Sequence, residues 1–479
     1  MFRMHSVKTH SPTFGFLLTV YLAGVIVLGG AANGGEFQNQ LLQAVAPLIL
    51  VFILWCEKNI SFSLLQKLVA ALFVLCPLLA GLQLIPLPSD FWSQLPNRDV
   101  ILTGFSLLND PIPDMPVSLA PLETASGLFH FLPPFALFIL TAYVLATERP
   151  FILYLPLLIV SLGVLSALLG LAQAIGPPQS NLYFYTVTNR GSGVGLFANA
   201  NHHSAFLLMC LPFLVVGTTG LIGHIKNHQH HLAVRIASTT GALMLVFGVL
   251  AAGSFFGYAM LGPVAIASTL LLGTRNSPSR SIPFSRIFSI RGVIIFFGAP
   301  VLAAIGYAFA TSPILPNIGI TVVNLDGTLA RPQLFAGALQ TLIDCFPIGA
   351  GLGAYQALYP LYEDPNFVTS TYANHVHNDY LEFTLELGLL GAIIICTALI
   401  LWAVTSYRAW GKTKASGANL QRAASISIFI VIAHSFVDYP LRTAAIAGLS
   451  AVAVGILVGP RSEPRRRGRL RLGEKRLVL

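Results

Sequence analysis

Long apolar segments that carry almost no charge dominate this chain and restrict what it can fold into. About twenty consecutive apolar residues in a helix are needed to cross the hydrocarbon core of a bilayer. We predict transmembrane helices at residues 14–33, 41–56, 67–87, 127–147, 151–175, 202–222, 232–252, 254–273, 291–311, 380–407, 423–438 and 441–459. Only 9% of the residues are charged, whereas soluble domains are about one quarter charged. The predicted fold class is therefore an all-α polytopic membrane protein with about twelve transmembrane helices.

Basic residues gather in three places between or after these segments. Arginine and lysine cluster in residues 274–291, in residues 408–422 and in the tail after Pro460. By the positive-inside rule all three face the cytoplasm, so the C-terminus is expected there. The segments that this count places on the opposite side are 88–126, 176–201 and 312–379. We expect the basic tail to bind anionic lipid, and we expect no nucleic-acid partner.

The outer segment 312–379 is too long for a simple connector, and such loops usually carry function or fold on themselves. Residues 329–346 show the spacing of a helix, with Arg331 in its first turn. A glycine-rich bend follows at residues 347–355. Glycines permit close approach of the backbone either to a ligand or to another helix, and both interpretations stay open.

A polar stretch at the end of this segment runs directly into a predicted transmembrane helix. Asp379, Glu382 and Glu386 are spaced so that they lie on one helical face at the edge of the membrane. His375 and His377 precede them, so the stretch places acid–base groups at a membrane surface. A zinc site at this histidine pair is the alternative, but no cysteine and no second histidine at helical spacing supports it. We therefore expect a metal-independent reaction without a cofactor.

Two further polar clusters lie where predicted helices reach the outer side. Arg190, Asn201 and His202 surround the start of one helix, where side chains and free N–H groups are suited to an anion, although a simple helix cap explains them equally well. His434 and Asp438 lie four residues apart near the end of another helix. Their alternative role is an ion pair that steadies two helices.

In this order, these motifs resemble the O-antigen ligase and polymerase family of bacterial membrane glycosyltransferases. His377-Asn378, followed after nine residues by Gly388 and Gly391, is similar to the family's His-Asn-x9-Gly-x-x-Gly pattern. Residues 195–202 are similar to its Gly-x-Phe-x-Asn-x-Asn-His block, and the resemblance extends over residues 185–440.

The chain departs from this family at two places. Phe255 and Phe256 stand where many relatives carry an arginine, and Ala392 replaces a threonine that ligases often have after the second glycine. The second departure favours a polymerase or a related glycan transferase over a strict lipopolysaccharide ligase.

The resemblance implies transfer of a glycan from an undecaprenyl-pyrophosphate carrier to an acceptor glycan or glycolipid, in O-antigen or exopolysaccharide biosynthesis. His377 is then the expected base, Asn378 positions the ring or the acceptor, and Glu382 orients the imidazole or substitutes as base. The residues expected to bind pyrophosphate or glycan are Arg190, Arg331, Arg442, Asn201, His202, His375, His434 and Asp438. The alternative function is a membrane transporter of a small anionic solute, a class that needs polar groups or broken helices near the bilayer midplane.

The predicted spans, the arginine count and the resemblance together give the four parts of the chain their expected places. Residues 1–311 form an N-terminal transmembrane bundle of nine spans, and residues 312–379 form one large periplasmic catalytic loop containing short helices. Residues 380–459 form the C-terminal transmembrane helices, and residues 460–479 form the basic cytoplasmic tail. The expected location is the bacterial inner membrane with the active site facing the periplasm, where proteins of envelope polysaccharide assembly are the further expected partners.

Overall fold

The computed structural model describes residues 13–32, 37–57, 61–148, 151–273, 331–363, 365–368, 373–411 and 417–460. The long helices are α1 (Thr13–Leu28), α2 (Phe37–Cys56), α3 (Leu64–Leu82), α7 (Leu132–Thr147), α8 (Phe151–Ile175), α9 (Ala200–His224), α10 (His228–Ala252), α11 (Phe255–Gly273), α15 (Arg331–Cys345), α17 (Asp379–Trp410), α18 (Ala418–His434) and α19 (Ala444–Leu457). The shorter elements are β1 (Pro86–Leu87), α4 (Ser89–Trp92), α5 (Asp99–Leu108), β2 (Met115–Pro116), α6 (Pro121–Gly127), η1 (Leu128–Phe131), α16 (Tyr355–Leu358), η3 (Tyr359–Leu361), η4 (Pro365–Phe367) and η5 (Pro440–Arg442). Strands β1 and β2 form one short antiparallel pair.

Eight helices in the described ranges are long and apolar enough to cross a membrane. They are α2, α3, the continuous stretch Pro121–Thr147, α8, α9, α10, α11 and α17. The all-α polytopic class is confirmed, but the expected twelve spans are not. The predicted spans 14–33, 423–438 and 441–459 correspond to α1, α18 and α19, which have only 16, 17 and 14 residues. The last two predicted spans run into the turn at residues 435–443, because that turn contains the apolar residues Phe436, Val437 and Leu441. The predicted span 291–311 lies outside the described residues.

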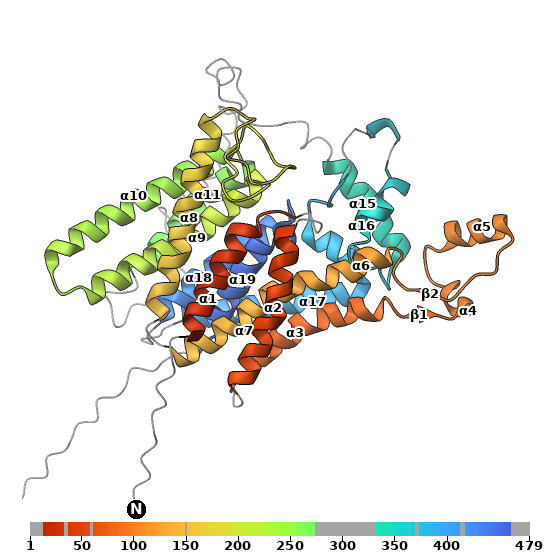
Figure 1. Ribbon diagram of the computed structural model, residues 1–479, viewed down its shortest axis with the longest axis horizontal. Helices are drawn as coiled ribbons and strands as arrows, with labels where there is room; N and C mark the ends of the chain where they lie inside the picture. Colours follow the sequence, from red (N-terminus) through yellow and green to blue (C-terminus); the bar gives the residue numbers. More distant parts are fainter. Residues whose placement is uncertain are drawn as a thin grey trace, which may run out of the picture.

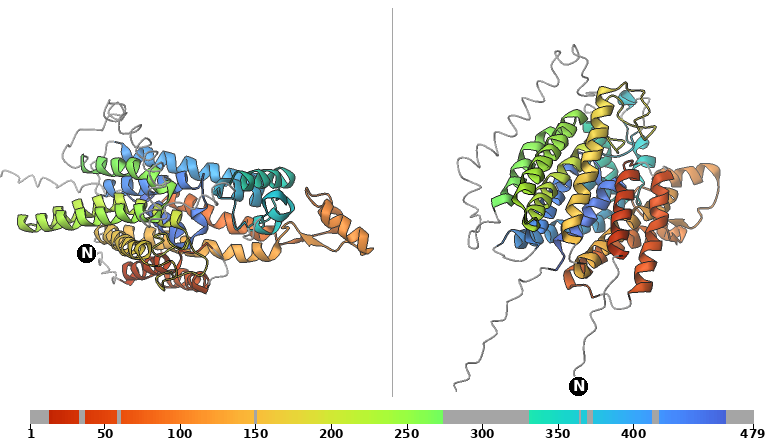
Figure 2. Two further views of the ribbon diagram at one scale, coloured as in Figure 1. Left: turned by 90° about the horizontal axis from the view of Figure 1, so that it is seen from above. Right: turned by 60° about the vertical axis from the view of Figure 1, so that its left-hand side comes forward.

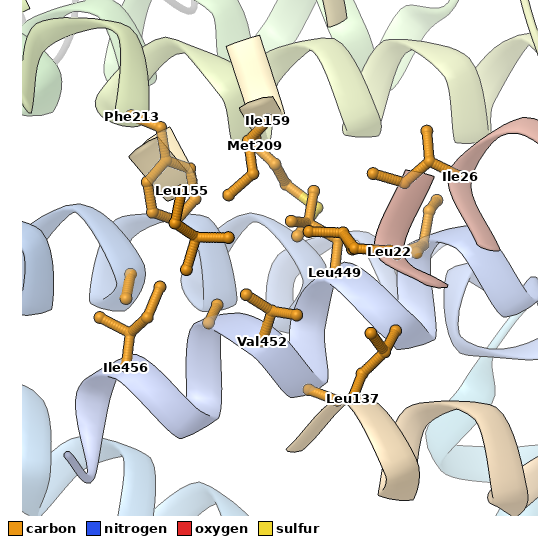
Figure 3. Close-up of a cluster of buried hydrophobic side chains, with 14 of the residues drawn as sticks. Leu22, Ile26, Leu137, Leu155, Ile159, Met209, Phe213, Leu449, Val452 and Ile456 are labelled. Carbon is orange, nitrogen blue, oxygen red and sulfur yellow. The ribbon is translucent and has the colours of Figure 1, made fainter. Parts of the chain in front are cut away.

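Helices α9 and α19 lie in the interior of the bundle. α9 packs against α8, α10, α11 and α18, while α19 packs against α1, α7 and α18. Figure 3 shows Leu22, Leu155, Met209 and Leu449 pointing toward one another from α1, α8, α9 and α19. Gly448 allows the close approach, since a Cβ there would meet side chains of α1 and α7. Small residues at such contacts are the usual means of packing helices within a membrane.

The two ends of the bundle differ in what they carry. Figure 1 shows the turn between α9 and α10 at one end of the long axis and the excursion of α4 and α5 at the other. Helices α15 and α16 lie toward the same end as that excursion, as both views of Figure 2 confirm. We call this the α15 end. The described parts of two predicted outer segments, 88–126 and 312–379, therefore lie toward the same end.

The glycine-rich bend packs against a break in α17. At Gly388 the backbone leaves the helical region with φ 63° and ψ −146°. The N–H of Leu389 donates to the carbonyl of Pro347 at 2.9 Å, and the carbonyl of Leu385 accepts instead from Ala350 N–H at 2.9 Å. Gly349 lies so close to the break that a Cβ there would meet the Glu386 carbonyl oxygen. Of the two interpretations of the bend, close approach to another helix is the one seen.

Candidate functional site

Asp438 is the centre of a buried polar cluster between α9, the start of α17 and the turn after α18. Its side chain is only 1% exposed. Its Oδ1 lies 3.0 Å from His377 Nδ1 and accepts from the Tyr439 N–H at 3.0 Å, while Oδ2 accepts from Asn201 Nδ2 at 2.7 Å. The Tyr439 N–H and the Asn201 amide nitrogen can only donate, so the cluster favours an ionised carboxylate.

His377 is held in an unusual backbone conformation that aims its ring at this carboxylate. Its φ is 58°, in the left-handed region that non-glycine residues rarely adopt. Because a carboxylate only accepts, Nδ1 must carry the proton, which leaves Nε2 with a free lone pair. The ring is 26% exposed, so this nitrogen belongs to the accessible part of the site. A neutral imidazole oriented by a carboxylate is the arrangement of a general base.

Two more histidines lie close to Asp438. His202 Nδ1 lies 2.9 Å from Thr443 Oγ1, and its Nε2 lies 3.8 Å from Asp438 Oδ1. His434 Nε2 lies 3.7 Å from Asp438 Oδ2, and its ring stacks on Phe256 at 4.1 Å. Both imidazoles are buried.

This surrounding fixes the charge of the carboxylate. Burial works to raise the pKa of Asp438, but the hydrogen bond from His377 and the nearby imidazoles of His202 and His434 hold that pKa well below its usual range. Asp438 is therefore anionic at any physiological pH. We call Asp438, His377, His202, His434 and Asn201 the Asp438 cluster.

A second charged cluster lies beside the first. Arg442 Nη2 lies 2.7 Å from Glu386 Oε2 and 3.4 Å from Glu382 Oε1. Glu382 Oε1 also lies 2.7 Å from His375 Nδ1, and its Oε2 accepts from the Val376 N–H at 2.9 Å. Burial tends to lower the pKa of Arg442, but the two carboxylates raise it above its ordinary value, so the guanidinium stays cationic. We call Arg442, Glu386, Glu382 and His375 the Arg442 cluster.

The pairing of carboxylates with histidines differs from the sequence interpretation. Glu382 was expected to orient His377, but it contacts His375, and Asp438 contacts His377. The reason is the direction of the chain. Residues 375 and 376 pass over the first turn of α17, where Glu382 points, while the left-handed turn at His377 directs its ring toward the turn after α18.

Asn378 acts through the backbone of α17. Its side-chain oxygen accepts from the Leu381 N–H at 3.0 Å, which caps the helix, and its Nδ2 donates to the Phe436 carbonyl at 3.1 Å. Asp379 makes a parallel link, accepting from Ser435 Oγ at 2.7 Å. These residues fasten the start of α17 to the turn after α18. They hold His377 in place. Of the two roles expected for Asn378, its hydrogen bonds favour positioning the ring over contacting the acceptor.

Of the remaining expected residues, Asn201 lies in one of the two clusters and Arg190 lies in neither. Asn201 joins the Asp438 cluster and also accepts from Ser254 Oγ at 2.7 Å. Arg190 donates to the Pro178 carbonyl at 3.2 Å and stacks on Tyr183, so the structure does not bring it into either cluster. Arg331 is the first residue of α15, and its side chain lies outside the described part.

Two residues of the site were missed by the sequence interpretation. The ring of Tyr439 lies 4.3 Å from that of His375, 4.8 Å from that of His377 and 5.0 Å from that of His202, so it joins the two clusters. Thr443 fixes His202. Their place in the sequence could have revealed them, because both lie in the polar run at residues 434–443 that interrupts the apolar sequence. In the described ranges, no group of three or more histidine, cysteine, aspartate or glutamate residues is arranged to hold a metal ion.

The fold and the site define a multi-pass, all-helical membrane protein with a histidine–carboxylate site at one end of its bundle. Residues 240–396 match the family model described as O-antigen ligase. The match confirms the resemblance to the O-antigen ligase and polymerase family, whose members are membrane glycosyltransferase-like enzymes. It includes the His377-Asn378 motif and ends before Asp438 and Arg442, which complete the two clusters. A comparison with curated proteins finds no match.

Proposed function

We propose that this protein transfers a glycan from an undecaprenyl-pyrophosphate carrier to an acceptor sugar at the periplasmic face of the inner membrane. The observation that carries the proposal is the 3.0 Å contact between His377 Nδ1 and Asp438 Oδ1, within a chain that matches the O-antigen ligase family. The contact leaves one imidazole nitrogen free to act as a base beside a membrane-spanning helix.

The reaction follows from these two side chains. The oxygen of the acceptor hydroxyl attacks the anomeric carbon of the donor sugar, and the bond from that carbon to the pyrophosphate oxygen breaks. The bonding electron pair leaves with the carrier pyrophosphate, and the hydroxyl proton moves to His377 Nε2. Asp438 stabilises the imidazolium that forms, because its carboxylate stays ionised.

The leaving pyrophosphate needs cationic partners, and arginine supplies them with bidentate hydrogen bonds. Arg442 is already neutralised by Glu386 and Glu382, so we assign it the role of holding α17 in position. Arg331 is the first candidate for the pyrophosphate, since it begins the helix that packs on α17. Arg190 is the second, because its guanidinium is exposed and lies flat against Tyr183.

The position of the site favours a transferase with a glycan or glycolipid acceptor over a transporter of a small solute. A transporter requires a polar path through the bilayer, whereas the two clusters gather at the start of α17 and in the turn after α18. The periplasmic placement rests on the arginine count, which puts Arg408 at the cytoplasmic end of α17, opposite to His377.

The test uses cells whose only copy of the protein is the full chain with His377→Asn. Asparagine tolerates the left-handed backbone and lacks a base, so the protein should fold and reach the membrane. We expect carrier-linked glycan to accumulate and the polymeric or ligated product to disappear. His228→Asn, at the opposite end of the bundle, is the matched control and should leave the products unchanged. Products of normal length and amount with His377→Asn would overturn the proposal, as would a defect limited to solute uptake.

A further inference from the structure

Helix α15 presents an apolar stripe that no neighbouring element in the described ranges covers. Phe335, Leu339 and Ile343 lie four residues apart along the helix and are 44%, 40% and 57% exposed. The opposite face carries Ala338 and Thr341, which are buried. The stripe is therefore distinct from the face by which α15 packs on the protein.

A polar stripe runs beside the apolar one. Gln340 Nε2 donates to Asp344 Oδ1 at 2.8 Å, one helical turn apart on the exposed side of α15. The helix therefore presents three faces: one packed on the protein, one exposed and apolar, and one exposed and polar. Helices that lie in the plane of a membrane interface have this pattern, with apolar side chains in the lipid and polar ones in water.

The apolar stripe adjoins the exposed apolar side of α17, a helix long enough to span a membrane. Phe346 follows α15 and is exposed, and the next residue, Pro347, accepts the hydrogen bond from the Leu389 N–H at 2.9 Å. Leu389, Leu390 and Ile393 of α17 are exposed as well, and α17 is one of the helices long and apolar enough to span. Within α17 this exposed apolar side begins directly after the break at Gly388.

We propose that α15 lies in the membrane interface, with Phe335, Leu339 and Ile343 among the acyl chains of the lipids that surround α17. The occupant of the stripe is the bilayer itself. The continuity through Pro347 and Leu389 carries this choice, because a bilayer that contacts the exposed side of α17 up to Leu389 must also meet the adjoining side chains of α15.

This placement sets the depth of the site. The break at Gly388 marks the edge of the hydrocarbon, and Asp379 begins α17 nine residues before it, or about 14 Å along the axis at the usual helical rise. His377 then lies at the level of lipid head groups. The inference does not depend on the proposed chemistry, since it concerns only which medium α15 contacts.

The test measures that medium directly with nitroxide labels on the full chain in lipid nanodiscs. The exposed cysteines are removed as Cys56→Ser and Cys396→Ser, and single labels are attached at Leu339→Cys, Ile343→Cys and, as the matched control on the same helix, Gln340→Cys. Collision with oxygen reports lipid, and collision with a water-soluble nickel chelate reports water.

We expect oxygen to relax the labels at Leu339 and Ile343 more strongly than the chelate does, and the reverse at Gln340. All three positions are exposed, so the labels should not disturb the packed face. Chelate collision at Leu339 and Ile343 equal to that at Gln340 would place the stripe in water and overturn the proposal. Labels at Leu339 and Ile343 that reach neither reagent would mean a protein partner covers the stripe, and would overturn it too.

Discussion

Replacing Asp438 by asparagine removes the charge behind His377 while keeping the shape of the side chain. The three closest partners of its oxygens are nitrogen donors. The amide oxygen of Asp438→Asn can keep the contacts with His377 and Tyr439. The NH2 group of the new asparagine then faces Asn201. The Asn201 amide can rotate so that its oxygen accepts from this group and its nitrogen donates to the Ser254 hydroxyl, which can accept as well as donate. The protein should therefore fold, with the charge lost and the hydrogen bond to His377 retained.

The expected loss of rate follows from the geometry. Two unit charges about 4 Å apart attract by about 4 kcal/mol at the effective dielectric constant of a protein surface. The ring of His377 is 26% exposed, so solvent screens part of this attraction. Asp438→Asn should therefore remove about 2–3 kcal/mol of transition-state stabilisation, which corresponds to a rate lower by roughly 30- to 160-fold. Removing the base itself, with His377→Asn, should cost about 100- to 10,000-fold.

The assay is the initial rate of glycan transfer in membranes that contain the carrier-linked donor of the same cells. If Asp438 acts through His377, the double variant His377→Asn with Asp438→Asn should be no slower than His377→Asn alone. Asp379→Asn is the matched control. Asp379 is an equally buried carboxylate, but it contacts Ser435 and not His377, so its loss should lower the rate less than Asp438→Asn does. A rate for Asp438→Asn within twofold of the unmodified protein, or a double variant that is clearly slower than His377→Asn, would refute the reasoning.

Three further outcomes are expected. Arg331→Lys should transfer glycan nearly as poorly as Arg331→Ala in the same assay, because lysine is a point charge without the planar fork; full activity would make Arg331 a structural residue. Glu386→Gln should lower the thermal unfolding temperature in detergent, since the partly buried Arg442 side chain loses the charge of its closest partner, at a cost of about 1.5–3 kcal/mol, and an unchanged temperature would contradict the pairing. Because the pKa of Asp438 is depressed, its stabilisation is complete above the unfolded pKa of about 3.9 and is lost only as pH falls through the lower folded value. The stability gap between the unmodified protein and Asp438→Asn should thus not shrink as pH falls from 8 to 5 in thermal denaturation, and a gap that shrinks within this range would count against the assignment.

The family resemblance placed His375, His377, Glu382, His434 and Asp438 in one site, and the structure brings these five together but leaves Arg190 apart. The pairing within the site was not predicted. Which carboxylate orients which histidine depends on contacts between elements, and His377 and Asp438 are 61 residues apart in the chain. Proximity in sequence favoured Glu382 because the left-handed turn at His377 has no signature in the amino-acid letters.

The number of spans was not confirmed, and the sequence left the role of the glycines open, for related reasons. Hydropathy measures apolar content and not the residue at which a helix stops, so it lengthened α19 past its start at Ala444. Glycine composition indicates close approach but does not identify the approaching group. The hydrogen bonds from the bend to Leu385 and Glu386 show that this group is the broken helix α17.

The break at Gly388 also bears on how the protein tolerates membranes of different thickness. Residues 389–410 of α17 rise about 33 Å, close to the roughly 30 Å of a bilayer's hydrocarbon core. A span that is too long for its bilayer tilts, and in an unbroken helix that tilt would swing every residue above it. Here the outer turns, with Glu382 and Glu386, are bound to the glycine-rich bend and to Arg442, and the helical conformation is interrupted at Gly388. We therefore expect a change in the tilt of the span to disturb the histidine–carboxylate pair less than it would through an unbroken helix.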